Sequence, residues 1–173
     1  RRMTARTAAR AALLAGCCAA AACRYRAGGS LPEDIRTVGV TLLRNQTRVP
    51  GLEGEITRAV ISALNSGGRL QVVDADGEPD LVVFGDVESY VKGAVRTDRY
   101  GDAAAFGVVI TARVSARRPG GEYLFKDAKV TNRSTDPDSG AVDLGKGQSE
   151  RLGRTQAVRD LGRNVASRIL EQG

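Results

Sequence analysis

The sequence contains no histidine and no tryptophan, and its three cysteines all lie before residue 24. A zinc site needs cysteine or histidine ligands within the fold, and serine or cysteine nucleophiles usually need a histidine base. The chain after Cys23 has neither the ligands nor the base. The sequence therefore excludes these two kinds of chemistry for that part of the chain, and it predicts neither an enzyme nor a bound cofactor.

Aromatic residues are also scarce, at 4% of 173 residues, while apolar residues make up 42%. This length and composition predict one compact domain with a core of valine, leucine, isoleucine and alanine. The net charge is +6, but Arg1, Arg2, Arg6 and Arg10 lie in the first ten residues. A nucleic-acid-binding domain would carry a basic stripe with stacking aromatics on its folded part. The sequence therefore predicts no nucleic-acid partner.

The N-terminal segment has the layout of an export signal. Met3–Arg10 is basic, and Ala11–Ala22 is an uncharged stretch too short to span a bilayer. Leu14–Cys17 (LAGC) resembles a lipobox, the sequence at which a lipoprotein is cleaved before a cysteine that is then acylated. Cleavage there leaves a short apolar region, so Cys23 is favoured as the lipidation site and Cys17 is the alternative. An ordinary secretory signal is a further interpretation, but clustering of every cysteine at this place disfavours it.

The chain that follows opens with a strand, a helix and a second strand. Residues 36–43 alternate in polarity, which predicts a strand with Val38, Val40 and Leu42 on one face. Apolar residues then recur at helical spacing over 52–64, and two glycines follow, which predicts an amphipathic helix of about sixteen residues. Residues 69–74 predict the second strand.

Three longer strands and a terminal helix complete the pattern. Residues 81–96 predict a half-exposed strand, with Val83, Gly85, Val87 and Val91 on one face and Asp86, Glu88, Lys92 and Arg96 mostly on the other. A hairpin loop at 97–102 leads to an inward-facing set in the next strand, namely Phe106, Val108, Ile110, Ala112 and Val114. A returning strand over 122–132 has imperfect alternation, which is compatible with a bulge. After a long loop, residues 148–172 predict an amphipathic helix.

These elements define the expected fold class and domain organisation. Residues 1–23 are predicted to be a signal peptide with a lipobox-type cysteine, and residues 24–173 to be one periplasmic domain. The element order βαββββα predicts a fold of the α/β class, more specifically an α+β two-layer sandwich. In it, two amphipathic helices pack on one face of a mixed sheet of four to five strands.

Several motifs in this order resemble the LptE family of lipopolysaccharide-assembly lipoproteins. The first is Cys23–Tyr25, which resembles the family's lipidated cysteine followed by a small residue and tyrosine, although Arg24 replaces the usual glycine. The remaining motifs encode the fold and are, in chain order, Leu31–Pro32 with Ile35–Val40, Asn45–Thr47, Pro50–Glu53, Ile56–Thr57 with Ala59, Asp80–Val87 and Ala157–Leu170. Jointly the resemblance covers about residues 23–173.

The resemblance implies a partner, a location and a ligand. Family members plug the lumen of an LptD-type outer-membrane β-barrel, are tethered by lipid on the periplasmic side of the outer membrane, and take part in lipopolysaccharide transport without covalent chemistry. They are also thought to bind lipopolysaccharide through basic residues, because Arg and Lys bind phosphates by charge-assisted hydrogen bonds. The candidates in this chain fall at two hairpins: Arg96 and Arg99 at the first, and Arg113, Arg117, Arg118, Lys126 and Lys129 around the second.

Two other functional interpretations are compatible with parts of the pattern. A periplasmic outer-membrane lipoprotein of the penicillin-binding-protein activator or curli-secretion type also opens with a valine-rich strand, a polar connector and a helix. An enzyme would have to use the carboxylates Asp86 and Glu88, or those of Asp136, Asp138 and Asp143. Because Asp86 and Glu88 share a strand face with Lys92 and Arg96, ion pairing is the expected role of these carboxylates.

Overall fold

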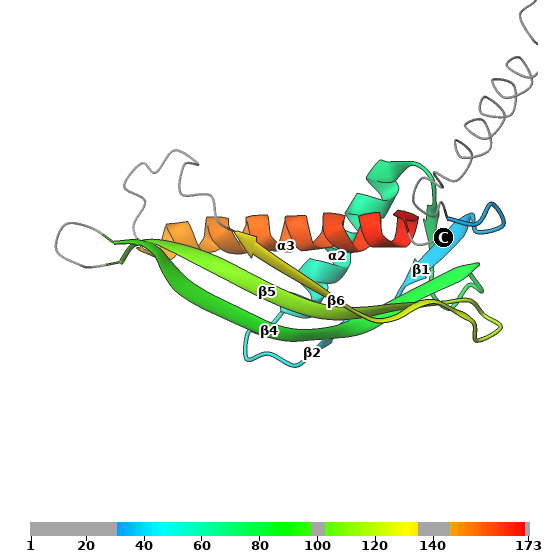
Figure 1. Cartoon of the computed structure of the whole chain (residues 1–173), viewed down its shortest axis with the longest axis horizontal. Coiled ribbons are helices and arrows are strands. Elements are labelled where there is room, and N and C mark those ends of the chain that lie inside the picture. The colour runs from blue at the N-terminus through cyan, green and yellow to red at the C-terminus, as the bar shows by residue number, and fades with distance from the viewer. Residues whose placement is uncertain (1–30, 98–102, 135–145, 172–173) are drawn as a thin grey trace, which may run out of the picture.

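The computed structural model of this chain describes residues 31–97, 103–134 and 146–171. They form one mixed sheet that is covered on one face by two helices (Figure 1), so the predicted two-layer α+β sandwich is confirmed. The strands are β1 (Thr37–Val40), β2 (Arg44–Asn45), β3 (Gln71–Val73), β4 (Leu81–Thr97), β5 (Ala103–Arg117) and β6 (Tyr123–Ser134). The helices are α2 (Leu52–Gly67) and α3 (Lys146–Glu171).

The sheet has a parallel half and an antiparallel half that meet at β4. Its main strands lie in the order β3-β1-β4-β5-β6, and β2 adds a short pairing with β4. β1 pairs in parallel with both β3 and β4, whereas β4, β5 and β6 form an antiparallel meander. The parallel pairing of β1 with β3 is the one that the predicted strand–helix–strand unit requires. The sheet has six strands rather than four or five because β2 is an additional element.

Both helices place one apolar stripe on the sheet. Residues at helical spacing are fully or almost fully buried, namely Leu52, Ile56, Val60 and Leu64 on α2 and Ala157, Leu161, Val165 and Ile169 on α3. They pack over the inward-facing residues of β4 and β5, which include Val83, Val87, Val108 and Ile110. These helical and sheet positions confirm the core predicted from the sequence. Within the described residues, no helix is long and apolar enough to cross a membrane.

The two helices touch at Gly162 of α3 and Ala59 of α2. A Cβ atom at position 162 would lie 2.6 Å from the carbonyl carbon of Ala59 and 2.8 Å from its Cβ. Real Cβ atoms do not approach backbone this closely, so the helices can adopt this spacing only with glycine at position 162. The glycine that weakens the helical pattern in the sequence is therefore a packing requirement.

The alternation predicted for β4 is correct for its first half and wrong for its second half. The register against β5 shifts between Val87 and Ser89, which marks a bulge that exchanges the two faces of the strand. As a result Val91, predicted to face the core, is 56% exposed. Lys92, predicted to face away from the helices, instead reaches Glu150 of α3 with an Nζ–Oε2 distance of 2.6 Å.

The first strand is shorter than predicted, and this changes the place of Leu42. The strand ends at Val40, and the chain then turns so that Leu43 is buried while Leu42 is 65% exposed. The prediction that Leu42 shares the inward face of Val38 is therefore wrong. Val40 is partly buried and packs against the core.

Residues 31–35, here called the lead segment, are fixed to several distant parts of the chain. Leu31 and Ile35 are buried in the core. The backbone N–H of Leu31 donates to the carbonyl of Leu170 at 3.4 Å, and Arg69 donates to the carbonyl of Leu31 at 3.0 Å. Asp34 binds Arg118, which follows the end of β5. The chain before β1 is thus attached to α3, to the α2–β3 connection and to the end of β5.

Asp80 fixes the start of β1 to the start of β4. Its Oδ2 accepts from the Thr37 hydroxyl at 2.8 Å and from the backbone N–H groups of Arg36 and Thr37 at 3.0 and 2.9 Å. The Thr37 hydroxyl, followed by these N–H groups, holds the pKa of the Asp80 carboxyl below its ordinary value of 3.8. The ionised carboxylate therefore stabilises the folded state.

We expect Asp80→Asn to lower the thermal midpoint at neutral pH. Because the pKa of Asp80 is lower in the folded than in the unfolded chain, its contribution to stability is complete above 3.8 and is lost as pH falls through the folded pKa. The difference in midpoint between wild type and variant should accordingly shrink at acidic pH. Thermal unfolding followed by circular dichroism across a pH series measures this, with Asp76→Asn in an exposed turn as the control. A constant difference at all pH values would contradict the assignment.

Candidate functional site

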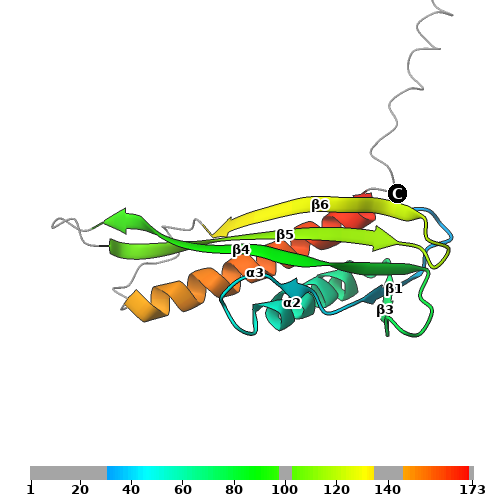
Figure 2. The same ribbon diagram turned by 90° about the horizontal axis from the view of Figure 1, so that it is seen from below.

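The face of the sheet that is turned away from the helices, here called the outer face, concentrates charged and aromatic side chains. Figure 2 shows the strands in front of both helices, so neither helix covers this face. The side chains come from β4, β5, β6 and the bulge within β6, and cations outnumber carboxylates among them. They are Phe84, Asp86, Glu88, Arg113, Arg117, Tyr123, Lys126, Asp127, Lys129 and Arg133.

Two carboxylates in the middle of the outer face are engaged by arginines. Asp86 accepts from Arg44 of β2 at 2.6 and 3.0 Å, and Glu88 accepts from Arg113 of β5 at 2.6 Å. The hydrogen bonds from Arg44 hold the pKa of Asp86 below its ordinary value. The predicted ion pairing of these carboxylates is present, with Arg44 and Arg113 as partners, whereas Lys92 pairs with Glu150 of α3. The side chain of Arg96 lies outside the described residues.

A shallow pocket of about 250 Å³ lies beside these ion pairs. Phe84 and Arg113 line it together with Leu42, Ser115 and Asp127. Asp127 has a φ of 51°, and its N–H donates to the Ser115 hydroxyl at 2.9 Å, at the point where the register between β5 and β6 shifts. The bulge expected in this strand is therefore present, close to its predicted place.

Two other cations of the outer face lie over aromatic rings. The guanidinium carbon of Arg117 is 5.8 Å from the centre of the Phe84 ring, and Nζ of Lys126 is 5.4 Å from the centre of the Tyr123 ring. The two rings are neighbours, with centres 6.4 Å apart and planes tilted by 59°. Both contacts fall within the range of cation–π attraction. These four residues, here called the ring–cation cluster, lie where β5 ends and β6 begins.

Arg118 makes no ring contact of this kind with a described residue and instead forms a bidentate ion pair with Asp34. Its guanidinium donates to the two carboxylate oxygens of Asp34 at 2.5 and 3.3 Å, and Glu122 lies 3.9 Å away. The hydrogen bond from Arg118 holds the pKa of Asp34 below its ordinary value. Arg118 therefore connects the lead segment to the sheet.

The structure separates the basic residues predicted to bind lipopolysaccharide into two groups. Arg96 lies near the end of β4, and Arg99 lies outside the described residues. The other five lie on β5, on β6 and at the turn between them, so they and Arg96 lie toward opposite ends of β5. Its length of 15 residues corresponds to roughly 50 Å at the usual rise per residue. Cys17 and Cys23 lie outside the described residues.

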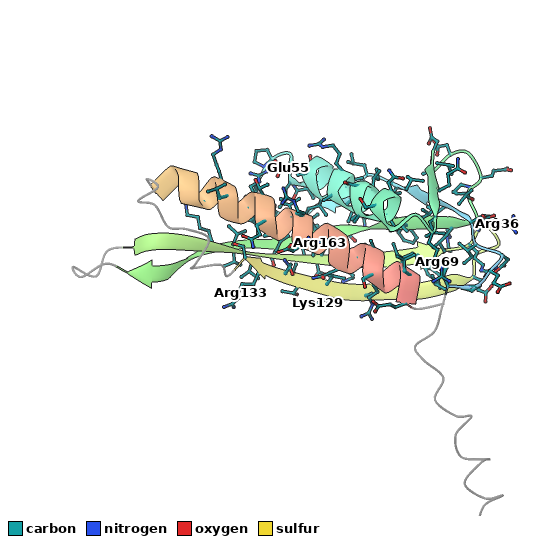
Figure 3. The ribbon with its side chains drawn as sticks, turned by 90° about the horizontal axis from the view of Figure 1, so that it is seen from above. Arg36, Glu55, Arg69, Lys129, Arg133 and Arg163 are labelled. Carbon is teal, nitrogen blue, oxygen red and sulfur yellow. The ribbon has the colours of Figure 1, made fainter. Side chains whose placement is uncertain are left out.

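Sequence reasoning missed two cations of this face, Arg44 of β2 and Arg133 of β6. Arg133 is exposed and follows Lys129 and Thr131 at alternate positions of β6, and Figure 3 shows Lys129 and Arg133 along this strand. The predicted strand ended at residue 132, whereas β6 continues to Ser134. Extending the alternation by two residues would have found Arg133.

Comparison with known proteins defines the family. A search of curated proteins by sequence gave no match. The family model for LptE, described as lipopolysaccharide-assembly, matches residues 35–171 and thus both helices and all six strands. The chain belongs to the LptE family. This membership confirms the resemblance seen in the sequence and places the chain among the outer-membrane lipoproteins of lipopolysaccharide assembly.

Solved structures show that the LptE-type fold of this chain is shared more widely. The PelC dodecamer from Paraburkholderia phytofirmans is similar with a TM-score of 0.54 and 18% identity, over 83% of this chain and 95% of that one. Protein XCC0632 from Xanthomonas campestris gives 0.53 and 13%, over 86% and 89%. An uncharacterized lipoprotein B from Nitrosomonas europaea gives 0.52 and 12%, over 81% and 84%. At these identities the likeness concerns the fold alone.

Proposed function

We propose that this chain assembles with and plugs an LptD-type outer-membrane β-barrel, and that it takes part in the transport of lipopolysaccharide to the outer leaflet. The observation that carries the proposal is the match of the LptE family model across nearly the whole described domain. The lumen of such barrels is polar. This domain carries charged side chains on the exposed face of its sheet and on the exposed faces of its helices, which suits a polar lumen.

The anchor in this proposal is a lipid on Cys23, with Cys17 as the alternative, on the periplasmic side of the membrane. The role is one of assembly and transport, without covalent chemistry. Asp86 and Glu88, the carboxylates that an enzyme would have to use, support a role without covalent chemistry, because each forms an ion pair with an arginine of a neighbouring strand. The outer face is the surface proposed to meet lipopolysaccharide, since its cations match the phosphates of that glycolipid.

Co-purification tests the partner and the anchor together. We expect a C-terminally tagged chain, purified from detergent-solubilised membranes, to bring down an LptD-type barrel and to carry an acylated N-terminal cysteine by mass spectrometry. Cys23→Ala should release the protein from the membrane fraction, whereas Cys17→Ala should not. Recovery of a peptidoglycan synthase or a secretion pore instead of the barrel would contradict the proposed function. An unmodified N-terminus would contradict the anchor.

A further inference from the structure

The strand β6 leaves one long edge of the sheet unpaired. It ends the strand order, whereas the strand at the opposite edge, β3, has only three residues. Within the described residues, β6 forms backbone hydrogen bonds with β5 alone. Figures 2 and 3 show β6 as the outermost strand on its side of the sheet. Such an edge presents the N–H and C=O groups of alternate residues to any strand that can align with it.

The C-terminal part of this edge is regular, and a helix supports it. Residues 128–134, here called the free edge, pair with β5 without a register shift. They span roughly 20 Å at the usual rise per residue. On the inner face Ala128 and Val130 are buried, and Asn164 of α3 donates to Asn132 at 2.9 Å. The backbone of the free edge is therefore fixed before a partner binds, which lowers the entropic cost of pairing.

The outer side chains of the free edge are basic and have no carboxylate partner among the described residues. Lys129, Thr131 and Arg133 are exposed at alternate positions. Lys129 lies opposite Arg113 of β5, whose charge is already matched by Glu88. Neither Lys129 nor Arg133 forms an ion pair with any residue that the structure describes. The free edge thus carries two unmatched positive charges with a threonine between them.

These charges decide which strand can pair with the free edge. If two copies of the chain align their free edges antiparallel over the full length, Lys129 of one copy faces Arg133 of the other. Like charges directly opposite one another are destabilising, whereas a strand with carboxylates at the matching positions gains two opposite-charge pairs. Cations on an edge usually protect a sheet against aggregation. Here they disfavour the chain's own edge and favour an acidic one.

We propose that the free edge binds an extended acidic segment of a partner protein, which adds to the sheet as a further strand. The segment carries Asp or Glu at positions i and i+4, which lie opposite Lys129 and Arg133 in either strand direction. A β-branched or hydroxyl residue at position i+2 lies opposite Thr131. The proposal goes beyond lipopolysaccharide transport and depends neither on the barrel nor on the glycolipid.

Calorimetric titration of the full lipidated chain in detergent micelles at low ionic strength tests the proposal with a synthetic seven-residue peptide. Valine occupies its odd positions, glutamate its second and sixth positions, and threonine its fourth. We expect wild type to bind this peptide, and Lys129→Glu/Arg133→Glu to bind it at least about tenfold more weakly. The same variant should instead bind a peptide in which lysine replaces both glutamates. Arg151→Glu/Arg159→Glu on α3 changes the net charge equally and should bind the acidic peptide like wild type.

Methylation of the peptide backbone separates strand addition from charge attraction. N-methyl groups on alternate residues remove the donors along one edge of the peptide and leave all of its charges. Of two peptides methylated at odd or at even positions, one should bind at least about tenfold more weakly than the unmodified peptide, and the other should lose much less. Peptide carbonyls labelled with carbon-13 should show the infrared band of a β-strand only when the peptide is bound.

Four results would each overturn the proposal. Equal binding of both methylated peptides would mean that charge alone attracts the segment. A folded Lys129→Glu/Arg133→Glu variant, as judged by its thermal midpoint, that binds the acidic peptide like wild type would place the contact elsewhere. If this variant loses affinity for lipopolysaccharide but not for the peptide, the two cations serve the glycolipid. Absence of peptide binding to wild type would exclude the acidic strand, and a dimer in sedimentation that the same variant dissociates would identify a second copy as the occupant.

Discussion

Val114→Asp is expected to unfold the domain or to leave it only marginally stable. Val114 is 1% exposed and lies opposite Gly85 on β4 and Ala128 on β6, so its cross-strand neighbours offer no cation and no hydrogen-bonding side chain. An uncompensated buried charge costs about 3–5 kcal/mol. That is a large part of the total of about 5–15 kcal/mol for a typical domain. Chemical denaturation followed by circular dichroism measures the loss.

The matched control is Val91→Asp, the same substitution on the opposite face of the sheet. Val91 is 56% exposed because of the bulge that precedes it in β4. An aspartate there stays hydrated, and we expect a change of at most about 1 kcal/mol, from strand propensity. A comparable loss of stability in the two variants would mean that the faces of the sheet are assigned wrongly.

Gly162→Ala is expected to destabilise the protein although alanine is the better helix former. The new methyl group would lie 2.6–2.8 Å from the backbone and Cβ of Ala59, so α3 must move away from α2. Overpacking of this kind costs about 1–3 kcal/mol, which offsets the gain of about 1 kcal/mol in helix propensity. Urea titration should show a lower midpoint with an unchanged slope.

Gly54→Ala supplies the control, because it makes the same change on the other helix. A Cβ at position 54 would approach only the end of the Arg58 side chain, at 3.3 Å, and that side chain can move. We therefore expect a gain of up to about 1 kcal/mol. The two variants should differ in sign, and a stabilised Gly162→Ala would refute the close crossing of the helices.

The helices, the long strands and the core could be predicted because each has a repeating apolar pattern. Leu52, Ile56, Val60 and Leu64 recur at a spacing that only a helix places on one face. Which side chains of β4 face the core beyond Val87 could not be predicted. A bulge adds one residue to the strand there, and no residue type in the sequence indicates its position. The short β2 was missed for a similar reason, because two residues are too few to show any period.

The candidate site was predictable in residue type but not in arrangement. The basic residues of β5 and β6 were identified, but the carboxylate partners of Arg113 and Arg118 lie 25 and 84 positions away in the sequence. Phe84 and Tyr123 meet only because the register of three strands brings their positions together. Contacts of this kind depend on strand pairing and turn geometry, which single-sequence patterns do not determine.

The attachment of the lead segment also determines how the domain responds to mechanical force. A pull applied before Leu31 acts first on two buried side chains, Leu31 and Ile35, and on the bonds to Leu170, Arg69 and Arg118. It then reaches β1, which lies between two parallel partners, β3 and β4. Because β1 is not an edge strand, it cannot be peeled off the sheet from one side, and its hydrogen bonds to both neighbours must shear together. In the lipid-anchored state proposed above, a pull on the N-terminal side of the domain is therefore resisted at the rate of forced unfolding, which depends on this short strand more than on the long hairpin.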